Sequence, residues 1–183
     1  DNNTAVGYFA LNANTTGTEH VAVGSLALDA NTTGNYNTAV GYNALTTNTT
    51  GDENTAVGNS ALKLNTTGEY NTALGLGSLQ NSTTSSNNTA VGYLALYENT
   101  TGAQNTAVGR LALDAATTAD DNTAIGNAAM TANTTGASNT SIGSGSMRNN
   151  TTADNNTAVG KDSLAANTTG AYNTSIGMNT LFD

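Results

Sequence analysis

The chain begins the same five-residue phrase every seventeen residues, from Asn3 to Asn173. Most copies read Asn-Thr-Ala-Val-Gly, and the eleven copies follow one another without an insertion or a deletion. A fixed period of this kind indicates one structural unit stacked many times. We therefore expect residues 1–183 to form a single array of about eleven 17-residue coils rather than several domains.

The length of the repeat and its residue types favour strands over helices. We number the repeat 1 to 17 from the first residue of the phrase. Seventeen residues are too few for a helical hairpin repeat, Thr and Val favour strands, and Asn and Gly favour turns. The sequence predicts an all-β parallel β-solenoid, a rod roughly 50 Å long. Each coil is expected to have a strand at positions 1–4, a corner at the invariant Gly of position 5, a second strand at about 8–10, and a polar return at 12–15.

Two positions of the repeat are expected to form the core of the coil. Position 4 is Val, Leu or Ile in every copy, and position 9 is Leu or Met. One large apolar pair in seventeen residues is a thin core, since ordering each residue costs about 1–2 kcal/mol of backbone entropy. We therefore expect further burial against other chains.

Position 3 is the predicted contact with those chains. It is always Ala or Ser, although it alternates away from the position-4 face. A free surface site would accept larger polar residues, so the small side chains predict an interchain contact at Ala5, Ala22, Ala39, Ala56, Ala73, Ala90, Ala107, Ala124, Ser141, Ala158 and Ser175. Lys at Ala39, Ala56 and Ala73 is then expected to split the assembly.

Composition argues against several classes of partner. The net charge of -9 would repel nucleic acid and anionic membranes, and no apolar run is long enough to span a membrane. There is no Cys, hence no disulfide or thiolate metal site. No signal-peptide pattern is present, and both ends fall within a repeat, so we expect a segment of a longer fibre.

The charged residues lie at variable positions and favour no catalytic site. Eight of the thirteen acids lie at positions 16 and 17. The pairs Asp52-Glu53 and Asp120-Asp121 are expected on a convex acidic ridge, with weak divalent-ion binding as the alternative. His20, the single His, is expected to replace an Asn structurally. We predict no enzyme activity, no cofactor and no metal site. The eight acids at positions 16 and 17 are Asp1, Glu19, Asp52, Glu53, Glu69, Asp120, Asp121 and Asp154.

Two polar patterns leave alternatives open. Asn-Thr-Thr recurs at position 12 and matches the N-glycosylation acceptor pattern, although an Asn ladder that closes a turn is favoured. The candidate glycosylation sites at position 12 are Asn14, Asn31, Asn48, Asn65, Asn99, Asn133, Asn150 and Asn167. Asn2, Asn81, Asn87, Asn149 and Asn155 match the same pattern. Ranks of Thr also suggest ice binding, but no face is expected to carry two outward Thr in each coil.

The second copy reads Glu19-His20-Val21-Ala22-Val23-Gly24. This phrase resembles the head repeats of trimeric autotransporter adhesins, and the other copies resemble the repeat arrays of tail-fibre-like proteins. The resemblance covers the whole chain, although the adhesin coil is shorter and no neck or coiled-coil stalk is present here. It implies a left-handed parallel β-roll and a homotrimeric fibre with an adhesive or spacer role.

These patterns predict a structural or adhesive fibre segment, extracellular, on a cell surface or on a virion. The expected partners are copies of the same chain, three of them as the resemblance implies, and cell-surface carbohydrate contacted by rim residues such as Tyr8, Tyr42 and Tyr93. The alternative is a lattice-like carbohydrate- or ice-binding β-solenoid, or a fibre coated with glycans.

Overall fold

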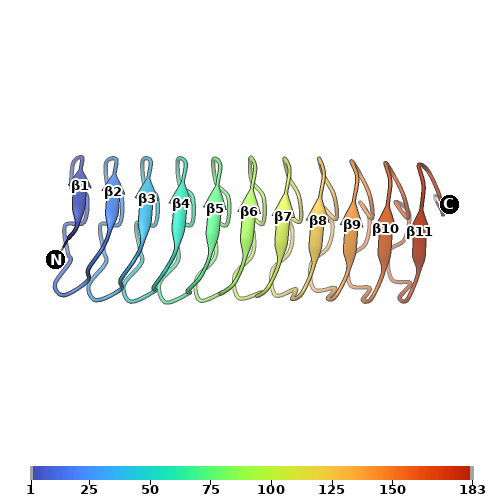
Figure 1. Cartoon of the computed structure of the whole chain (residues 1–183). Helices are drawn as coiled ribbons and strands as arrows, with labels where there is room; N and C mark the ends of the chain where they lie inside the picture. The colour runs from blue at the N-terminus through green and yellow to red at the C-terminus, as the bar shows by residue number, and fades with distance from the viewer. Residues whose placement is uncertain (1, 182–183) are drawn as a thin grey trace.

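The computed structural model describes residues 2–181, so Asp1, Phe182 and Asp183 lie outside the described part of the chain. The chain winds into narrow coils that stack in a line, with the two termini at opposite ends (Figure 1). Each coil has one strand of three residues, and the eleven strands form one sheet in sequence order. The strands are β1 (Thr4–Val6), β2 (Val21–Val23), β3 (Thr38–Val40), β4 (Thr55–Val57), β5 (Thr72–Leu74), β6 (Thr89–Val91), β7 (Thr106–Val108), β8 (Thr123–Ile125), β9 (Thr140–Ile142), β10 (Thr157–Val159) and β11 (Thr174–Ile176).

Neighbouring strands pair in parallel, and each residue pairs with the residue seventeen positions later. Ala22 pairs with Ala39, and Ala39 pairs with Ala56. The sequence prediction of an all-β parallel β-solenoid with 17-residue coils is confirmed, and residues 2–181 contain no helix. The left-handed sense of winding stays a prediction.

Position 5 turns the chain at the end of each strand, as the invariant Gly predicts. Gly41 has a φ of 137°, and a Cβ atom there would lie 2.5 Å from the carbonyl oxygen of Gly58 in the next coil. L-residues rarely adopt this φ, and the stacked backbones leave no space for a side chain. The Gly of position 5 is therefore required on both counts.

The predicted second strand at positions 8–10 is wrong. These residues form turns, and the Leu of position 9 has a positive φ, as at Leu28 (53°) and Leu45 (53°). The residue at position 7 also has a positive φ, for example 61° at Leu26. In a strand, adjacent side chains would point to opposite faces. The left-handed residues instead let positions 8 and 9 both point inward, so that Ala27 and Leu28 are both completely buried.

The faces of the strand are the reverse of those predicted. The Ala or Ser of position 3 points into the coil and is fully buried in the inner coils, whereas the apolar residue of position 4 points outward. Position 9 belongs to the core as predicted, with Leu62, Leu96 and Met130 completely buried. The interior is too narrow for a large residue opposite this Leu, so small residues fill the strand side.

Two columns of asparagines complete the interior. At position 1, the Asn54 N–H donates to Asn37 Oδ1 (2.9 Å), and Asn54 Nδ2 donates to the Gly68 carbonyl (2.8 Å). At position 12, Asn48 Nδ2 donates to Asn31 Oδ1 (2.9 Å), which forms the Asn ladder that the sequence favours. These amides satisfy backbone groups that the coil buries. Hydrogen bonds therefore stabilise an interior that apolar contacts alone fill only in part.

Candidate functional site

The outward side of the sheet is a long surface that no other part of the described chain covers. We call positions 2 and 4 of the eleven strands the outer strand face. Position 2 supplies one Thr per coil, with Val21 as the exception, and position 4 supplies one Val, Leu or Ile. Position-4 side chains are exposed or half-buried along the rod, and the most exposed include Val6 (58%), Leu74 (46%) and Ile176 (69%). No charged residue lies at positions 1–5, so this face is uncharged from end to end.

The position-3 residues predicted as interchain contacts lie inside the coil and not on this face. Ala22, Ala39, Ala56, Ala73, Ala90, Ala107, Ala124 and Ala158 have no exposed surface within the single chain, Ser141 has none and Ser175 has 2%. Only Ala5, in the first coil, is exposed. Residues that are already enclosed by their own coil have no surface to offer to another chain. The predicted contact through position 3 is therefore wrong, and Lys at Ala39, Ala56 or Ala73 would disrupt the coil itself.

One signal in the sequence could have shown that position 3 points inward. The two copies with Ser at position 3 also have a hydroxyl residue at position 8. Ser141 Oγ donates to the Ser146 carbonyl (2.9 Å), and the hydroxyls of Ser175 and Thr180 lie 2.7 Å apart. Ser78 and Ser163 also place a hydroxyl at position 8 although their coils have Ala at position 3, so the sequence signal is weak and the hydrogen bonds show that positions 3 and 8 face each other.

His20 occupies a position-1 site inside the coil and is 1% exposed. Its Nδ1 accepts the Asn37 N–H (3.2 Å), as Asn Oδ1 does elsewhere in the column, and its Nε2 lies 3.2 Å from Asn31 Nδ2. Burial lowers the pKa of His20 below 6.5, opposed by backbone hydrogen bonds with Gly34 and Asn37 and by the charge of Asp52. A neutral imidazole therefore substitutes for an amide, and no nucleophile lies beside it.

The acids of position 16 have a structural role. Asp52 Oδ1 accepts the backbone N–H of Asn35 (2.6 Å), and Asp120 Oδ1 accepts that of Ala103 (2.7 Å). Each carboxylate thus pairs with the coil before it, while the acids of position 17, Glu53 and Asp121, are exposed. The paired acids do not converge on a cleft. No group of three potential ligands for a metal ion occurs within residues 2–181.

Asp114 is a half-buried acid at position 10. Burial raises its pKa, and a hydrogen bond from the Thr131 hydroxyl opposes the rise. The two residues occupy position 10 of neighbouring coils, so the contact is another link between coils. No pair of carboxylates suited to acid–base catalysis results.

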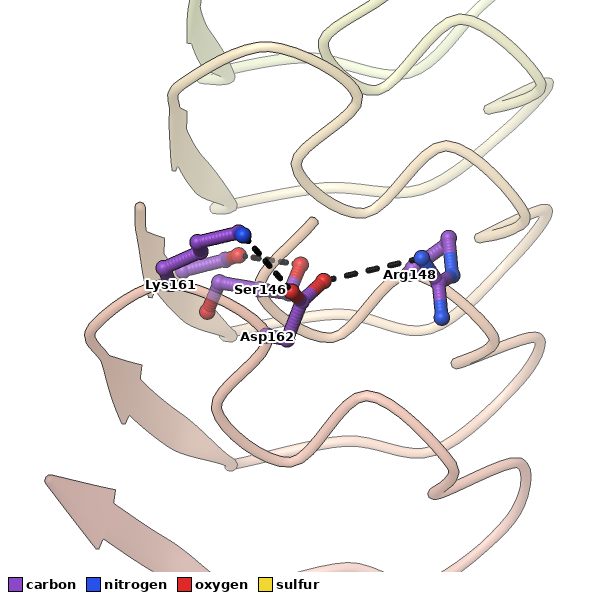
Figure 2. A network of polar contacts seen from close by, with 5 residues as sticks. Ser146, Arg148, Lys161 and Asp162 are labelled. Carbon is purple, nitrogen blue, oxygen red and sulfur yellow. Dashed lines mark hydrogen bonds and ion pairs between the residues drawn. The ribbon is translucent and has the colours of Figure 1, made fainter. Parts of the chain in front are cut away.

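Two of the four basic residues, Arg148 and Lys161, lie beside Asp162 near the C-terminal end (Figure 2). Arg148 Nη1 lies 3.5 Å from Asp162 Oδ1, and Lys161 Nζ lies 3.9 Å from Asp162 Oδ2. Both basic side chains are exposed, and exposed ion pairs typically contribute under about 1 kcal/mol. We interpret the cluster as a weak link between adjacent coils.

A hollow lies at the C-terminal end of the stack. It measures about 360 Å³ and is lined by residues that include Leu164, Asn167, Asn173 and Leu181. These residues belong to the last coils, which no further described coil covers. The hollow is the interior of the stack seen from its end.

The position-12 asparagines are unsuited to glycosylation in the folded rod. Asn31, Asn48, Asn65, Asn99, Asn133 and Asn150 are completely buried. Asn14 and Asn167, in the terminal coils, are half-buried and hydrogen-bonded through Nδ2. A glycan on a buried amide would have to pass through the stacked backbones. Exposed acceptor patterns remain at Asn2, Asn87, Asn149 and Asn155.

The candidate site is therefore the outer strand face, and the other polar clusters maintain the coil. In the part of the chain that the structure describes, no helix is long and apolar enough to cross a membrane. Comparison with protein-family models, curated proteins and solved structures found no match to this chain.

Proposed function

We propose that this chain is a segment of a multimeric fibre that extends from a cell surface or a virion and presents a binding surface. Copies of the chain associate through the outer strand face, and three chains is the number that the adhesin resemblance implies. The observation that carries the proposal is the uncharged row of exposed and half-buried apolar side chains at position 4 along the rod.

The size of this face fits a stable interface. Eleven coils about 4.8 Å apart, each contributing its three-residue strand and the two flanking residues at about 3.3 Å per residue, span about 800 Å². A standard protein interface buries about 800 Å² on each partner. Monomeric soluble proteins rarely expose apolar patches of more than a few hundred Å². A second and a third copy would remove this apolar surface from water without changing the interior of any coil.

Lys at two outward positions tests the interface without touching the core. Val57 and Val91 occupy position 4 and are only partly buried. We expect Val57→Lys/Val91→Lys to fold with an unchanged circular dichroism spectrum but to sediment as a monomer, because the ammonium groups would have to be buried in the interface. Thr67→Lys, at an exposed position of the polar return, is the matched control and should keep the oligomer. A wild-type monomer at tens of micromolar would overturn the proposal.

A lattice-binding function is the second candidate, because the outer strand face carries one Thr rank beside one apolar rank. Such a surface repeats once per coil, as binding to ice or to a regular polysaccharide would require. A monomeric rod that shows thermal hysteresis, or that is retained on an insoluble polysaccharide, would favour this function over the fibre.

A further inference from the structure

Two ranks of side chains border the outer strand face. Position 17 precedes each strand, and position 6 follows the Gly that ends it. On three strands both borders carry a large apolar or aromatic side chain. These pairs are Tyr36 and Tyr42 on β3, Tyr70 and Leu76 on β5, and Tyr172 and Met178 on β11, and the six side chains are 49% to 82% exposed.

The two members of each pair cannot contact one another within a chain. Tyr70 and Leu76 are six positions apart, and the strand between them places the two side chains roughly 15–20 Å apart. Both point away from the coil, as their exposure shows. Contacts within one chain therefore do not explain why apolar side chains occur at both borders of the same strand.

The paired apolar borders can contact one another when several copies surround a common axis. If the chains run parallel and in register, the position-6 border of one copy meets the position-17 border of the next at the same level. Leu76 then packs on Tyr70 of the neighbouring copy, Tyr42 on its Tyr36, and Met178 on its Tyr172. Each contact buries apolar area that one chain leaves in water.

The charges on the two borders agree with this arrangement. Position 17 carries Glu19, Glu53 and Asp121, which precede β2, β4 and β8. The position-6 residues of those strands are neutral, namely Ser25, Asn59 and Asn127. Arg110 and Lys161 at position 6 likewise meet Gln104 and Asn155. No like charges meet at any level.

An antiparallel arrangement is electrostatically unfavourable. Antiparallel copies that overlap fully bring like borders together, and β4 then lies opposite β8. Glu53 of each copy would face Asp121 of the other, and like charges in contact are destabilising. Tyr70, before β5, would meet Gln104, before β7, so its ring would lose the apolar partner.

We infer that copies of this chain assemble parallel and in register, with the β3, β5 and β11 border pairs closing the seam between neighbouring copies. The inference rests on the proposed self-association and adds its direction, its register and the residues of the seam. The partner at this surface is a second copy of the same chain.

Cysteine cross-linking tests the seam, since the chain contains no Cys. The double variant Tyr70→Cys/Leu76→Cys should give covalent oligomers with a short bismaleimide reagent, whereas each single variant should not. Tyr93→Cys reports the antiparallel arrangement, because Tyr93 follows β6, the central strand, and would meet its own equivalent there. We expect no cross-link from Tyr93→Cys.

The outcomes separate the seam from self-association itself. Cross-links from the double variant alone support the inference. Covalent dimers of Tyr93→Cys, or an oligomeric double variant that does not cross-link, overturn the seam but leave self-association standing. A monomeric sedimentation mass for the wild-type rod overturns both.

Discussion

At the scale of single residues, the protein relies on amides where most domains rely on large apolar side chains. The Asn side chains at positions 1 and 12 are buried and donate to carbonyl groups of the coil, as Asn37 does to Gly51 (2.8 Å). A buried polar group is destabilising unless it is hydrogen-bonded, so these columns accept few substitutions. His20 is tolerated because neutral imidazole offers an acceptor in the same place.

His20 should make the stability of the second coil depend on pH. Its pKa is lowered in the folded state, so the unfolded chain binds the proton more readily below pH 6.5. The contribution of neutral His20 is therefore complete above about pH 6.5 and is lost as the pH falls below it, by at most about 1.4 kcal/mol per pH unit.

The comparison of wild type with His20→Asn isolates this effect. Urea unfolding of the two proteins at pH 7.5 and at pH 5 should show a larger loss of stability on acidification for the wild type. Hydrogen exchange should place the difference in the first coils. Equal losses in the two proteins would show that His20 does not titrate on unfolding.

At the scale of the coil, position 12 and position 15 act as a pair. In most coils the Asn of position 12 donates to the carbonyl of a Gly at position 15, and a Cβ atom on Gly51 would lie 2.5 Å from Asn48 Oδ1. Two coils without that Asn have larger residues at position 15, namely Ser85 and Ala119. The Asn ladder is interrupted at these coils, which leaves Asn65 Oδ1 and Asn99 Oδ1 buried without a hydrogen-bond partner.

Repair of the ladder should stabilise the rod. We expect Ala116→Asn to donate to Asn99 Oδ1 and to accept from Asn133 Nδ2, because the coils stack in register. Asn150, with Ala153 at position 15, shows that Asn is compatible with a Cβ atom there. The gain should be about 1 kcal/mol, or about 2–4 °C in the midpoint of thermal unfolding. Thr118→Asn, at an exposed position in the same coil, should leave the midpoint unchanged, and an equal rise would contradict the ladder as the cause.

At the scale of the whole molecule, the rod is one unit repeated, so each coil contacts only its neighbours. Parallel pairing continues from β1 to β11, and hydrogen bonds between coils extend around the loops as well, as from Leu28 N to the Ala44 carbonyl (3.0 Å). The interior is closed by this stacking without a second chain. Association between copies then concerns the outer strand face and its two borders.

The seventeen-residue register predicts which deletions the rod accepts. Removal of residues 71–87 takes out one whole coil and rejoins Tyr70 to Asn88, so every remaining residue keeps its position. We expect this variant to fold and to shorten the rod by about 4.8 Å. Removal of residues 71–86 leaves one residue too many in a coil, which would move inward side chains to the outside.

Small-angle scattering and thermal unfolding measure the two deletion variants. The whole-coil variant should have nearly the wild-type midpoint, and the other should unfold earlier or fold only in part. Equal stability of the two variants would show that the register does not govern the packing.

The sequence by itself determined the unit and the way it stacks. The fixed period, the invariant Gly and the Leu or Met of position 9 predicted the parallel coils, the corner and the core, because a repeated environment selects the same residue type in every copy. Only the tertiary structure decided which face of the strand is enclosed. The side chains of a three-residue strand alternate between its two faces whichever face is enclosed. The enclosed face depends on the left-handed residues at positions 7 and 9, which bring positions 8 and 9 opposite position 3. That geometry encloses Ala22 and its equivalents and leaves the position-4 rank on the surface.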